Sequence, residues 1–381
     1  MARHPKTNGT FPKIEEWLKM TEFIDKAARF QRFARRSPRQ AARALFVVLL
    51  DRLRAGLIRP ASRSGFLASV YFTFFSSRFY REHRAVLSGI VANLNGDIAV
   101  QRSSSQLRRN IHRLEKGLIM RPRRAVFAED YIEATVSLFL RGAAGAALDR
   151  DELKWAADVL TTYFSVVSDT PRIRKAKERF LAWPGQALTP SFVPYPSSSR
   201  ARSDISFDQL YALFSERRSV RWYSPAPVPQ DLVEKAVSAA SLASSACNRQ
   251  PYSFLLFRDP ETAARIASLA GGTGGFSKNI PCLILIVGDL SYYVHERDRH
   301  LVYIDASLAS AQLMLAFQTL GLSTCAINWP DVEENEKALQ AAVGLKAHER
   351  VIMFIAVGYA DQDGQIPYSQ KKGADVLLQA L

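Results

Sequence analysis

A chain of 381 residues is long enough for two domains of ordinary size, of about 100–200 residues each. Apolar residues make up 48% and charged residues 23%, a globular composition that excludes a disordered chain. The net charge of +15 is unevenly placed, because residues 1–200 carry 35 Lys and Arg against 17 Asp and Glu, and residues 201–381 carry 16 against 19. This asymmetry predicts two units with different roles.

The first half of the chain is predicted to be helical. Helical spacing of apolar residues occurs over 17–36, 39–58, 108–118, 131–140, 151–167 and 172–182. Residues 64–79 are rich in aromatic side chains, and their periodicity leaves a helix and a buried strand open. No alternating strand pattern precedes residue 200, so residues 1–182 are predicted to form a basic, mainly helical domain of unknown role.

A change of composition follows at residues 183–203, which hold four prolines and a run of three serines. Prolines cannot donate a hydrogen bond to a helix or sheet, so this segment is predicted to be a linker. Helices and strands then interleave over 204–381. Helices are predicted over 206–216, 230–244, 260–269, 304–320 and 333–343, and strands over 254–257, 282–287, 323–327 and 351–357. Helices covering a central sheet are the expected architecture.

The first motif with a chemical meaning is Arg217-Arg218-Ser219-Val220-Arg221, at the end of a predicted helix. Three guanidinium groups and a hydroxyl match the oxygens of a phosphate group. A solvated basic helix end is the alternative reading of the motif taken alone.

Three further motifs follow in order. Cys247-Asn248-Arg249-Gln250-Pro251 precedes a strand, and its carboxamides both donate and accept, as the edge of a flavin ring requires. Gly321-Leu322-Ser323-Thr324-Cys325 follows a long Ala-rich helix, and a basic pair, Lys371 and Lys372, stands near the end of the chain. A polar turn closed by proline is the alternative for the first of these motifs.

The four motifs in this order resemble the nitroreductase family of FMN-dependent enzymes, over about 180 residues. The finer resemblance is to a nitroreductase-like branch of polysaccharide-associated bacterial proteins, here with an N-terminal helical extension. The implied fold is α+β: a three-layer sandwich with a central, mostly antiparallel or mixed sheet, preceded by the helical domain. The implied domains are residues 1–182, the linker 183–203, and an FMN-binding domain over 204–381.

The resemblance also assigns roles to matching positions. Arg217 and Ser219 would hold the FMN phosphate beside Arg218, and Lys371 or Lys372 would close over it. Arg221 would lie near flavin N1 and the C2 carbonyl, where a cation stabilises the reduced ring. Asn248 and Gln250 would bond the ring edge or the ribityl chain. A backbone amide among Ala326, Ile327 and Asn328 would face flavin N5, and no side chain is assigned as a catalytic acid or base.

In the family the flavin lies at a homodimer interface. The small residues Ala306, Ala309, Ala311 and Ala316 would let two copies of one helix approach closely, or would pack against the helix's own sheet. Tyr252, Arg249 and Asn328-Trp329 depart from many relatives, and these departures leave the substrate open.

The remaining sequence features give weaker indications of function. Gly271-Gly272-Thr273-Gly274-Gly275 lacks the Lys-Ser or Lys-Thr of a phosphate loop and is interpreted as a flexible loop. The six histidines are scattered, so no metal site is predicted. Cys325 is interpreted as a small core residue. Three cysteines without close pairing and no apolar leader favour a cytoplasmic protein, with a membrane-peripheral position as the second option.

A basic cluster at residues 108–118 could contact phosphate, nucleic acid or the flavin domain, or form a solvated helix face ending at Gly117. For residues 1–200 as a whole, protein contacts rank first, an anionic membrane surface second, and nucleic acid last, because no nucleic-acid motif accompanies the charge.

Two functions are therefore predicted. The first is an FMN oxidoreductase that takes hydride from NAD(P)H and passes it to an unidentified small-molecule acceptor at the same site. The second is a non-catalytic dimerisation scaffold, whose basic domain docks on a membrane or a polysaccharide-synthesis complex.

Overall fold

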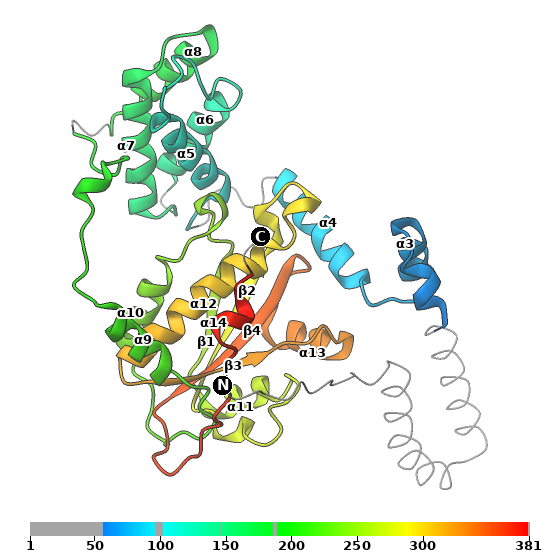
Figure 1. Ribbon diagram of the computed structural model, residues 1–381. Coiled ribbons are helices and arrows are strands. Elements are labelled where there is room, and N and C mark those ends of the chain that lie inside the picture. Colours follow the sequence, from blue (N-terminus) through cyan, green and yellow to red (C-terminus); the bar gives the residue numbers. More distant parts are fainter. Residues whose placement is uncertain (1–55, 96–101, 146, 186–188, 380–381) are drawn as a thin grey trace, which may run out of the picture. The chain divides into compact units, whose positions relative to one another are not determined.

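The computed structural model describes residues 56–95, 102–145, 147–185 and 189–379 (Figure 1). The chain divides into two compact units, residues 1–80 and 81–381, and each is described by itself. The described part of the first unit contains α3 (Gly65–Phe74), which begins at Ser64, whose hydroxyl accepts from the Leu67 amide at 3.2 Å. Of the two structures left open for the aromatic-rich residues 64–79, the helix is the one observed, over Gly65–Phe74. None of its side chains is buried. The predicted helix over 17–36 lies outside the described residues.

Four predicted helices of the first half form a bundle around one core. They are α5 (Ser105–Leu118), α6 (Ile132–Ala144), α7 (Arg150–Val166) and α8 (Pro171–Leu181). Leu107, Ile111 and Leu114 recur at helical spacing and are fully buried against rings such as Phe139 and Tyr163. This shared apolar core is what holds the four helices together.

Two features of this part differ from the expectations. Gly117 does not end its helix, because α5 continues to Leu118; the glycine leaves room for the Phe127 ring, which would lie 2.4 Å from an added Cβ. In addition, α4 (Tyr80–Leu94) was not predicted. Its Gly89 packs directly on the Leu290 backbone, 2.7 Å from the position of an added Cβ.

The proline-rich segment is attached to α7 through a buried carboxylate. Asp158 Oδ2 accepts from the backbone amides of Ser191 at 2.9 Å and Phe192 at 2.8 Å, and from Lys154 Nζ at 2.5 Å. Burial disfavours the charge, but Lys154 and the two amides outweigh burial and hold the pKa of Asp158 below its usual value. The domain limits 1–182, 183–203 and 204–381 stay a prediction.

Replacing Asp158 with asparagine is expected to lower stability by about 1–3 kcal/mol at neutral pH. Because the folded pKa lies below that of the unfolded chain, about 3.9, the contribution is present above that value and is lost as the pH falls through the folded pKa. Thermal unfolding from pH 7 to pH 3 should show the two proteins converging in acid. Asp231→Asn is the control, since its pair with Lys235 has the same i,i+4 spacing but is exposed; an equal loss in both variants would contradict the prediction.

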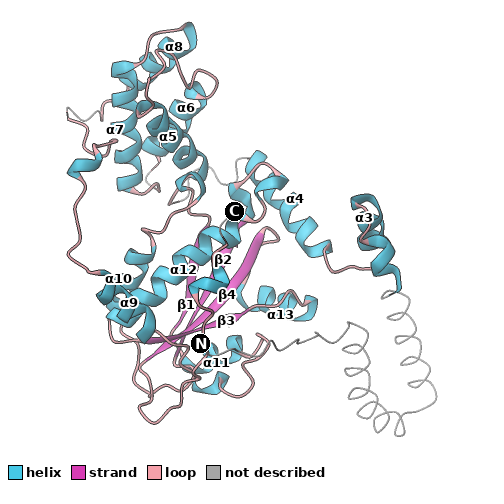
Figure 2. Cartoon of the chain, in the orientation of Figure 1, coloured by secondary structure: helices cyan, strands magenta, loops and turns pink. Residues whose placement is uncertain are grey.

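The second half of unit 81–381 is built on a four-stranded sheet (Figure 2). The strands are β1 (Tyr252–Phe257), β2 (Cys282–Asp289), β3 (Ser323–Asn328) and β4 (Glu349–Gly358), in the order β1-β2-β4-β3. All neighbouring strands are antiparallel, and β1 and β3 form the two edges. Within the described residues, no strand precedes this sheet.

Helices cover both faces of the sheet. One face packs against α10 (Gln230–Ala240) and α12 (Leu301–Thr319), and the other against α11 (Pro260–Ala267) and α13 (Glu333–Val343). Side chains of strand β2 alternate between the two faces of the sheet. Ile284 and Ile286 pack on the side of α10 and α12, and Leu283 and Leu285 on the side of α11 and α13. The predicted α+β three-layer sandwich is confirmed. Helix α10 ends at Ala240, four residues before its predicted end.

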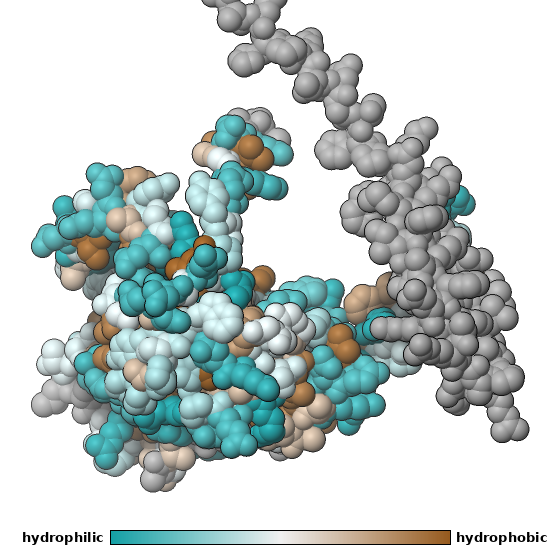
Figure 3. All heavy atoms as spheres, turned by 90° about the horizontal axis from the view of Figure 1, so that it is seen from below, coloured by the Kyte–Doolittle hydropathy of each residue, from teal (hydrophilic) through white to brown (hydrophobic). Residues whose placement is uncertain are grey.

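Helix α12 has two different faces. Ala306 and Ala309 are fully buried, and Ala306 packs against the sheet, whereas Ile304 and Leu308 are about half exposed. The segment Glu296–Thr319 is long and apolar enough to cross a membrane by length and composition, but its buried face packs as in a core helix. The part of the molecular surface seen in Figure 3 is mainly polar, with apolar residues scattered over it.

Candidate functional site

The Arg-Arg-Ser-Val-Arg motif lies along the free edge of β3. Helix α9 (Phe207–Glu216) ends directly before Arg217, and the chain then forms a bridge between Ser219 and Thr324, with the Val220 amide donating to the Thr324 carbonyl at 3.1 Å. This backbone pairing places the segment that carries the four predicted residues beside one edge of the sheet. We call Arg217, Arg218, Ser219 and Arg221 the arginine cluster.

The cations of the arginine cluster have no acidic partner in the part of the chain that the structure describes. Within the described residues, no carboxylate lies within 4.0 Å of a guanidinium nitrogen of Arg217, Arg218 or Arg221. Arg221 lies over the Phe276 ring, 5.8 Å from its centroid. Three half-buried cations without a counter-charge attract an anion, and a phosphate group offers the oxygens that guanidinium forks require.

Two side chains of β3 lie beside the cluster. Thr324 is 1% exposed, and its hydroxyl oxygen has no hydrogen-bond partner in the described part of the chain. Burial raises the pKa of the Cys325 thiol, although Arg221 and Arg217 oppose this rise. Cys325 is therefore a neutral core residue at physiological pH, as expected from the sequence.

The backbone register of β3 separates the residues predicted to face flavin N5. Residues of an edge strand point their N–H and C=O groups alternately toward the neighbour and outward. Because the Thr324 carbonyl points outward to Val220, the backbone groups of Ala326 and Asn328 also point outward, whereas those of Ile327 face β4. Of the three predicted residues, Ala326 and Asn328 are thus the two whose amides point away from β4, the strand that pairs with β3 in the described part of the chain.

The Asn-x-Gln motif forms a tight turn before β1. Cys247, Asn248 and Gln250 all have left-handed backbone angles, with φ of 55°, 54° and 49°. The turn is tied to α12, since the Ala246 amide donates to Asp305 Oδ2 at 2.9 Å. We call residues 245–250 the ring-edge loop.

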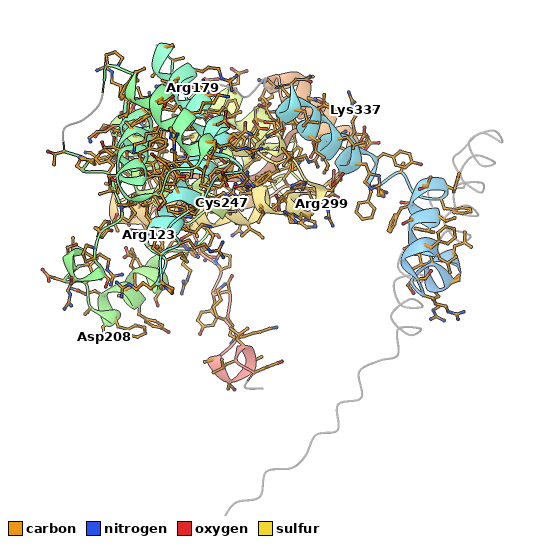
Figure 4. The ribbon with its side chains drawn as sticks, turned by 90° about the horizontal axis from the view of Figure 1, so that it is seen from above. Arg123, Arg179, Asp208, Cys247, Arg299 and Lys337 are labelled. Carbon is orange, nitrogen blue, oxygen red and sulfur yellow. The ribbon has the colours of Figure 1, made fainter. Side chains whose placement is uncertain are left out.

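A second set of contacts joins the ring-edge loop to the helical bundle. Arg108, on α5, donates from Nε to the Asn248 carbonyl and from a terminal nitrogen to Gln250 Oε1, both at 2.9 Å. The Gln250 amide nitrogen donates to the Ser241 carbonyl at 2.6 Å. Cys247 lies next to the bundle (Figure 4). Of the readings weighed for the basic cluster at 108–118, contact with the C-terminal domain is the one that the structure shows for Arg108.

Arg249, which lies between Asn248 and Gln250 in the loop, is 7% exposed, and its Nε has no hydrogen-bond partner among the described residues. Its guanidinium lies 4.8 Å from the centroid of the Tyr293 ring. This buried cation marks the departure from many relatives noted in the sequence.

Lys371 and Lys372 are not brought to the arginine cluster by any contact within the described chain. Both lie in an exposed C-terminal segment that also exposes Ile366, Tyr368 and Leu378. Their role over a phosphate group stays a prediction.

The arginine cluster and the ring-edge loop lie far apart within one copy of the chain. The cluster is next to edge strand β3, and the loop precedes edge strand β1, which places three strand spacings of about 4.8 Å between them. They also lie near opposite ends of the sheet, because Thr324 pairs with Val357 while Tyr252 pairs with Gly288, the partner of Arg350. Within one copy, the two motifs therefore lie toward diagonally opposite corners of the sheet.

The Gly-rich segment forms an ordered turn near the arginine cluster. Buried Thr273 donates from its hydroxyl to the Ala267 and Ala270 carbonyls, both at 2.9 Å, and its own carbonyl accepts from Phe276. The turn thereby places the Phe276 ring beneath Arg221. Sequence reasoning missed this ring and also Glu152, the carboxylate that pairs with Arg108 at 3.0 Å. Neither has a local sequence signal.

Comparison with known proteins points to one family. The family model described as the nitroreductase family matches residues 214–274 and 268–359. A protein of Archaeoglobus fulgidus named "Putative NADH dehydrogenase/NAD(P)H nitroreductase" is 31% identical over 154 residues, covering 40% of this chain and 86% of that protein. Iodotyrosine deiodinase 1 of Pongo abelii is 23% identical over 245 residues, covering 56% of this chain and 83% of that protein.

Comparison with solved structures returns the following two proteins among others. An FMN-dependent nitroreductase from Clostridium difficile R20291 has a TM-score of 0.37 and 25% identity, covering 42% of this chain and 92% of that one. A nitroreductase-type protein in complex with FMN from Desulfovibrio desulfuricans has a TM-score of 0.39 and 24% identity, covering 45% and 96%.

Proposed function

Because this chain belongs to the nitroreductase family, we propose that it is an FMN-dependent oxidoreductase whose flavin lies between two copies of the chain. The observation that carries the proposal is the arginine cluster, in which three cations with no acidic partner among the described residues lie beside the edge strand β3. A Desulfovibrio desulfuricans relative was solved in complex with FMN, which supports the same cofactor here.

The residues present fit the phosphate end of FMN. Arg217 and Ser219 supply a guanidinium fork and a hydroxyl, and Arg218 adds a neighbouring charge. The unpartnered Thr324 hydroxyl beside Ser219 is a further polar group that a ligand at this edge would satisfy. Lys371 or Lys372 would complete the charge balance from the exposed C-terminal segment.

The residues present also fit the ring. Bound FMN would supply hydride transfer, and the protein would supply position and electrostatics. Arg221 would hold positive charge near N1 and the C2 carbonyl, while an outward amide of Ala326 or Asn328 would donate to N5. Asn248 has no side-chain hydrogen bond within the described residues, so its carboxamide is available to the ring edge or ribityl chain.

A homodimer is required if both motifs contact the same flavin, since they lie at opposite edges of one sheet. Exposed apolar side chains support such an assembly. They occur on α9 at Phe207, Tyr211 and Phe214, on α12 at Ile304 and Leu308, and in the C-terminal segment at Ile366, Tyr368, Val376, Leu377 and Leu378. Helices α9 and α12 are neighbours, joined by a 3.0 Å hydrogen bond from Gln318 to Glu216. Their exposed residues are the natural surface for a second copy.

The test is to purify the protein, record its visible spectrum and titrate the apoprotein with FMN, with the oligomeric state measured by light scattering. We expect a yellow dimer that binds one FMN per copy. A dimer without FMN binding would reject the oxidoreductase and favour the scaffold function. A monomer that binds FMN would reject the composite site.

The electron donor and acceptor are a further part of the proposal. NADH and NADPH are compared as donors, and the acceptors are a quinone, a nitroaromatic compound and a halogenated phenol, the last because iodotyrosine deiodinases are among the relatives. Steady oxidation of either nucleotide supports the NAD(P)H-linked reaction. The cytoplasmic location and the membrane-peripheral option stay predictions, which flotation with anionic liposomes would examine.

A further inference from the structure

We propose that the α5–α8 bundle is a clamp for the ring-edge loop, and that Arg108 is the positioning residue through which it acts. The inference rests on the proposed FMN site and extends it to a residue outside the region that the family model matches. It assigns a role in flavin binding to the basic first half of the chain.

The ring-edge loop needs to be held. Left-handed backbone angles are unfavourable for residues other than glycine and persist where surrounding contacts enforce them. Cys247, Asn248 and Gln250 adopt such angles within four residues. Two side chains from the second half of the chain accept from its amides: Asp305 Oδ2 from Ala246 at 2.9 Å, and the Ser245 hydroxyl from Gln250 at 3.2 Å.

Arg108 adds a restraint at Asn248 and Gln250, two of the three left-handed residues. Its guanidinium donates to the Asn248 carbonyl and to Gln250 Oε1 at 2.9 Å, and to Glu152 Oε2 at 3.0 Å. A planar guanidinium makes three such contacts at fixed angles, which a lysine ammonium on a flexible stem does not reproduce. Arg108 thus grips the loop on both sides of Arg249.

The anchor behind Arg108 is built into the bundle. The Glu152 side chain is 2% exposed and also accepts from the Ser103 hydroxyl at 2.6 Å and the Ser104 amide at 2.9 Å. Its carboxylate is therefore fixed to the start of α5, and the Trp155 ring lies 5.4 Å from the guanidinium. A fixed anion orients the guanidinium, and the guanidinium orients the loop.

This arrangement separates the two carboxamides of the motif. Both polar atoms of the Gln250 carboxamide are hydrogen-bonded, Oε1 to Arg108 and Nε2 to the Ser241 carbonyl, so this side chain supports the loop. Asn248 keeps its side chain available, so it is the carboxamide that the clamp presents to the ring.

Cys247 provides a probe of the clamp that does not depend on flavin. It lies within the strained turn and is partly exposed, whereas Cys282 and Cys325, the remaining cysteines of the chain, are 1% exposed each. The rate of maleimide labelling of the native apoprotein therefore reports opening of the loop. Cys247→Ser gives the background from the two buried thiols.

We expect Arg108→Ala to accelerate labelling of Cys247 about tenfold and to raise the FMN dissociation constant by a similar factor. Arg108→Lys should resemble Arg108→Ala, because it keeps the charge but loses the fork. Lys116→Ala, which removes an exposed charge from the same helix, is the matched control and should behave as the wild type.

Two further variants guard against misfolding. Arg108→Ala leaves the Glu152 carboxylate buried without its cation, and Arg108→Ala combined with Glu152→Gln removes that charge. Gln250→Ala leaves the Arg108–Glu152 pair intact and should also accelerate labelling. If Gln250→Ala and the double variant both label at the wild-type rate, the clamp is refuted. Faster labelling in a protein that binds no FMN would instead refute the proposed function and leave the clamp standing.

Discussion

Replacing Arg217 with alanine is expected to weaken FMN binding by about 100-fold and to leave riboflavin binding almost unchanged. A bidentate, charge-assisted contact to a phosphate contributes about 3 kcal/mol, and each 1.4 kcal/mol is a factor of ten in the dissociation constant. Arg217 caps the end of α9 and has no carboxylate within 4.0 Å in the described residues, so its charge is free for a ligand. Fluorescence titrations with the two flavins measure the difference directly.

The comparison between flavins makes this prediction specific to the phosphate. Arg265→Ala removes an exposed arginine from α11 and should change neither affinity. Arg218→Ala should have a smaller effect than Arg217→Ala, because one Arg218 nitrogen already donates to the Arg217 carbonyl at 3.1 Å. Equal loss of FMN and riboflavin binding in Arg217→Ala would show that the variant damages the fold instead of a phosphate contact.

Elements with a strong local signal could be predicted from the sequence. The helices of the bundle carry apolar residues at helical spacing, and α5, α7 and α8 begin at side-chain caps, Ser104, Asp149 and Thr170. Helix α4 was missed for a physical reason. Three of its four buried residues, Ala85, Gly89 and Ala92, are small, so they leave no stripe of large apolar side chains to detect.

For the candidate site, too, the local features could be predicted and the long-range ones could not. The arginine cluster and the ring-edge loop are each continuous in sequence, so their residue types could be recognised. Their separation across the sheet depends on the strand order, which no spacing reveals. The contact between Arg108 and Asn248 joins residues 140 positions apart, so the sequence suggested the flavin domain only as one of several partners for the basic cluster.

Replacing Arg221 with alanine is expected to lower the midpoint potential of bound FMN by about 30–60 mV. Reduction places negative charge on the ring, and a nearby cation stabilises that charge more than it stabilises the oxidised ring. A loss of about 1.4–2.8 kcal/mol corresponds to this range, because 30 mV is about 1.4 kcal/mol for a two-electron couple. The Arg221 guanidinium is positioned by the Phe276 ring and by a weak 3.4 Å bond to the Ser219 carbonyl.

Arg221→Lys separates charge from geometry in this prediction. The lysine keeps a positive charge near the ring but loses the planar guanidinium that lies over Phe276, so its potential should lie between those of the wild type and Arg221→Ala. Potentiometric titration against reference dyes measures all three proteins at the same pH. If Arg221→Ala still binds FMN and its potential equals that of the wild type, Arg221 does not lie near the flavin ring. Arg221 would then be a second contact to the phosphate. In that case Arg221→Ala should reduce the affinity for FMN and not that for riboflavin, so the two titrations together decide which end of the cofactor this arginine serves.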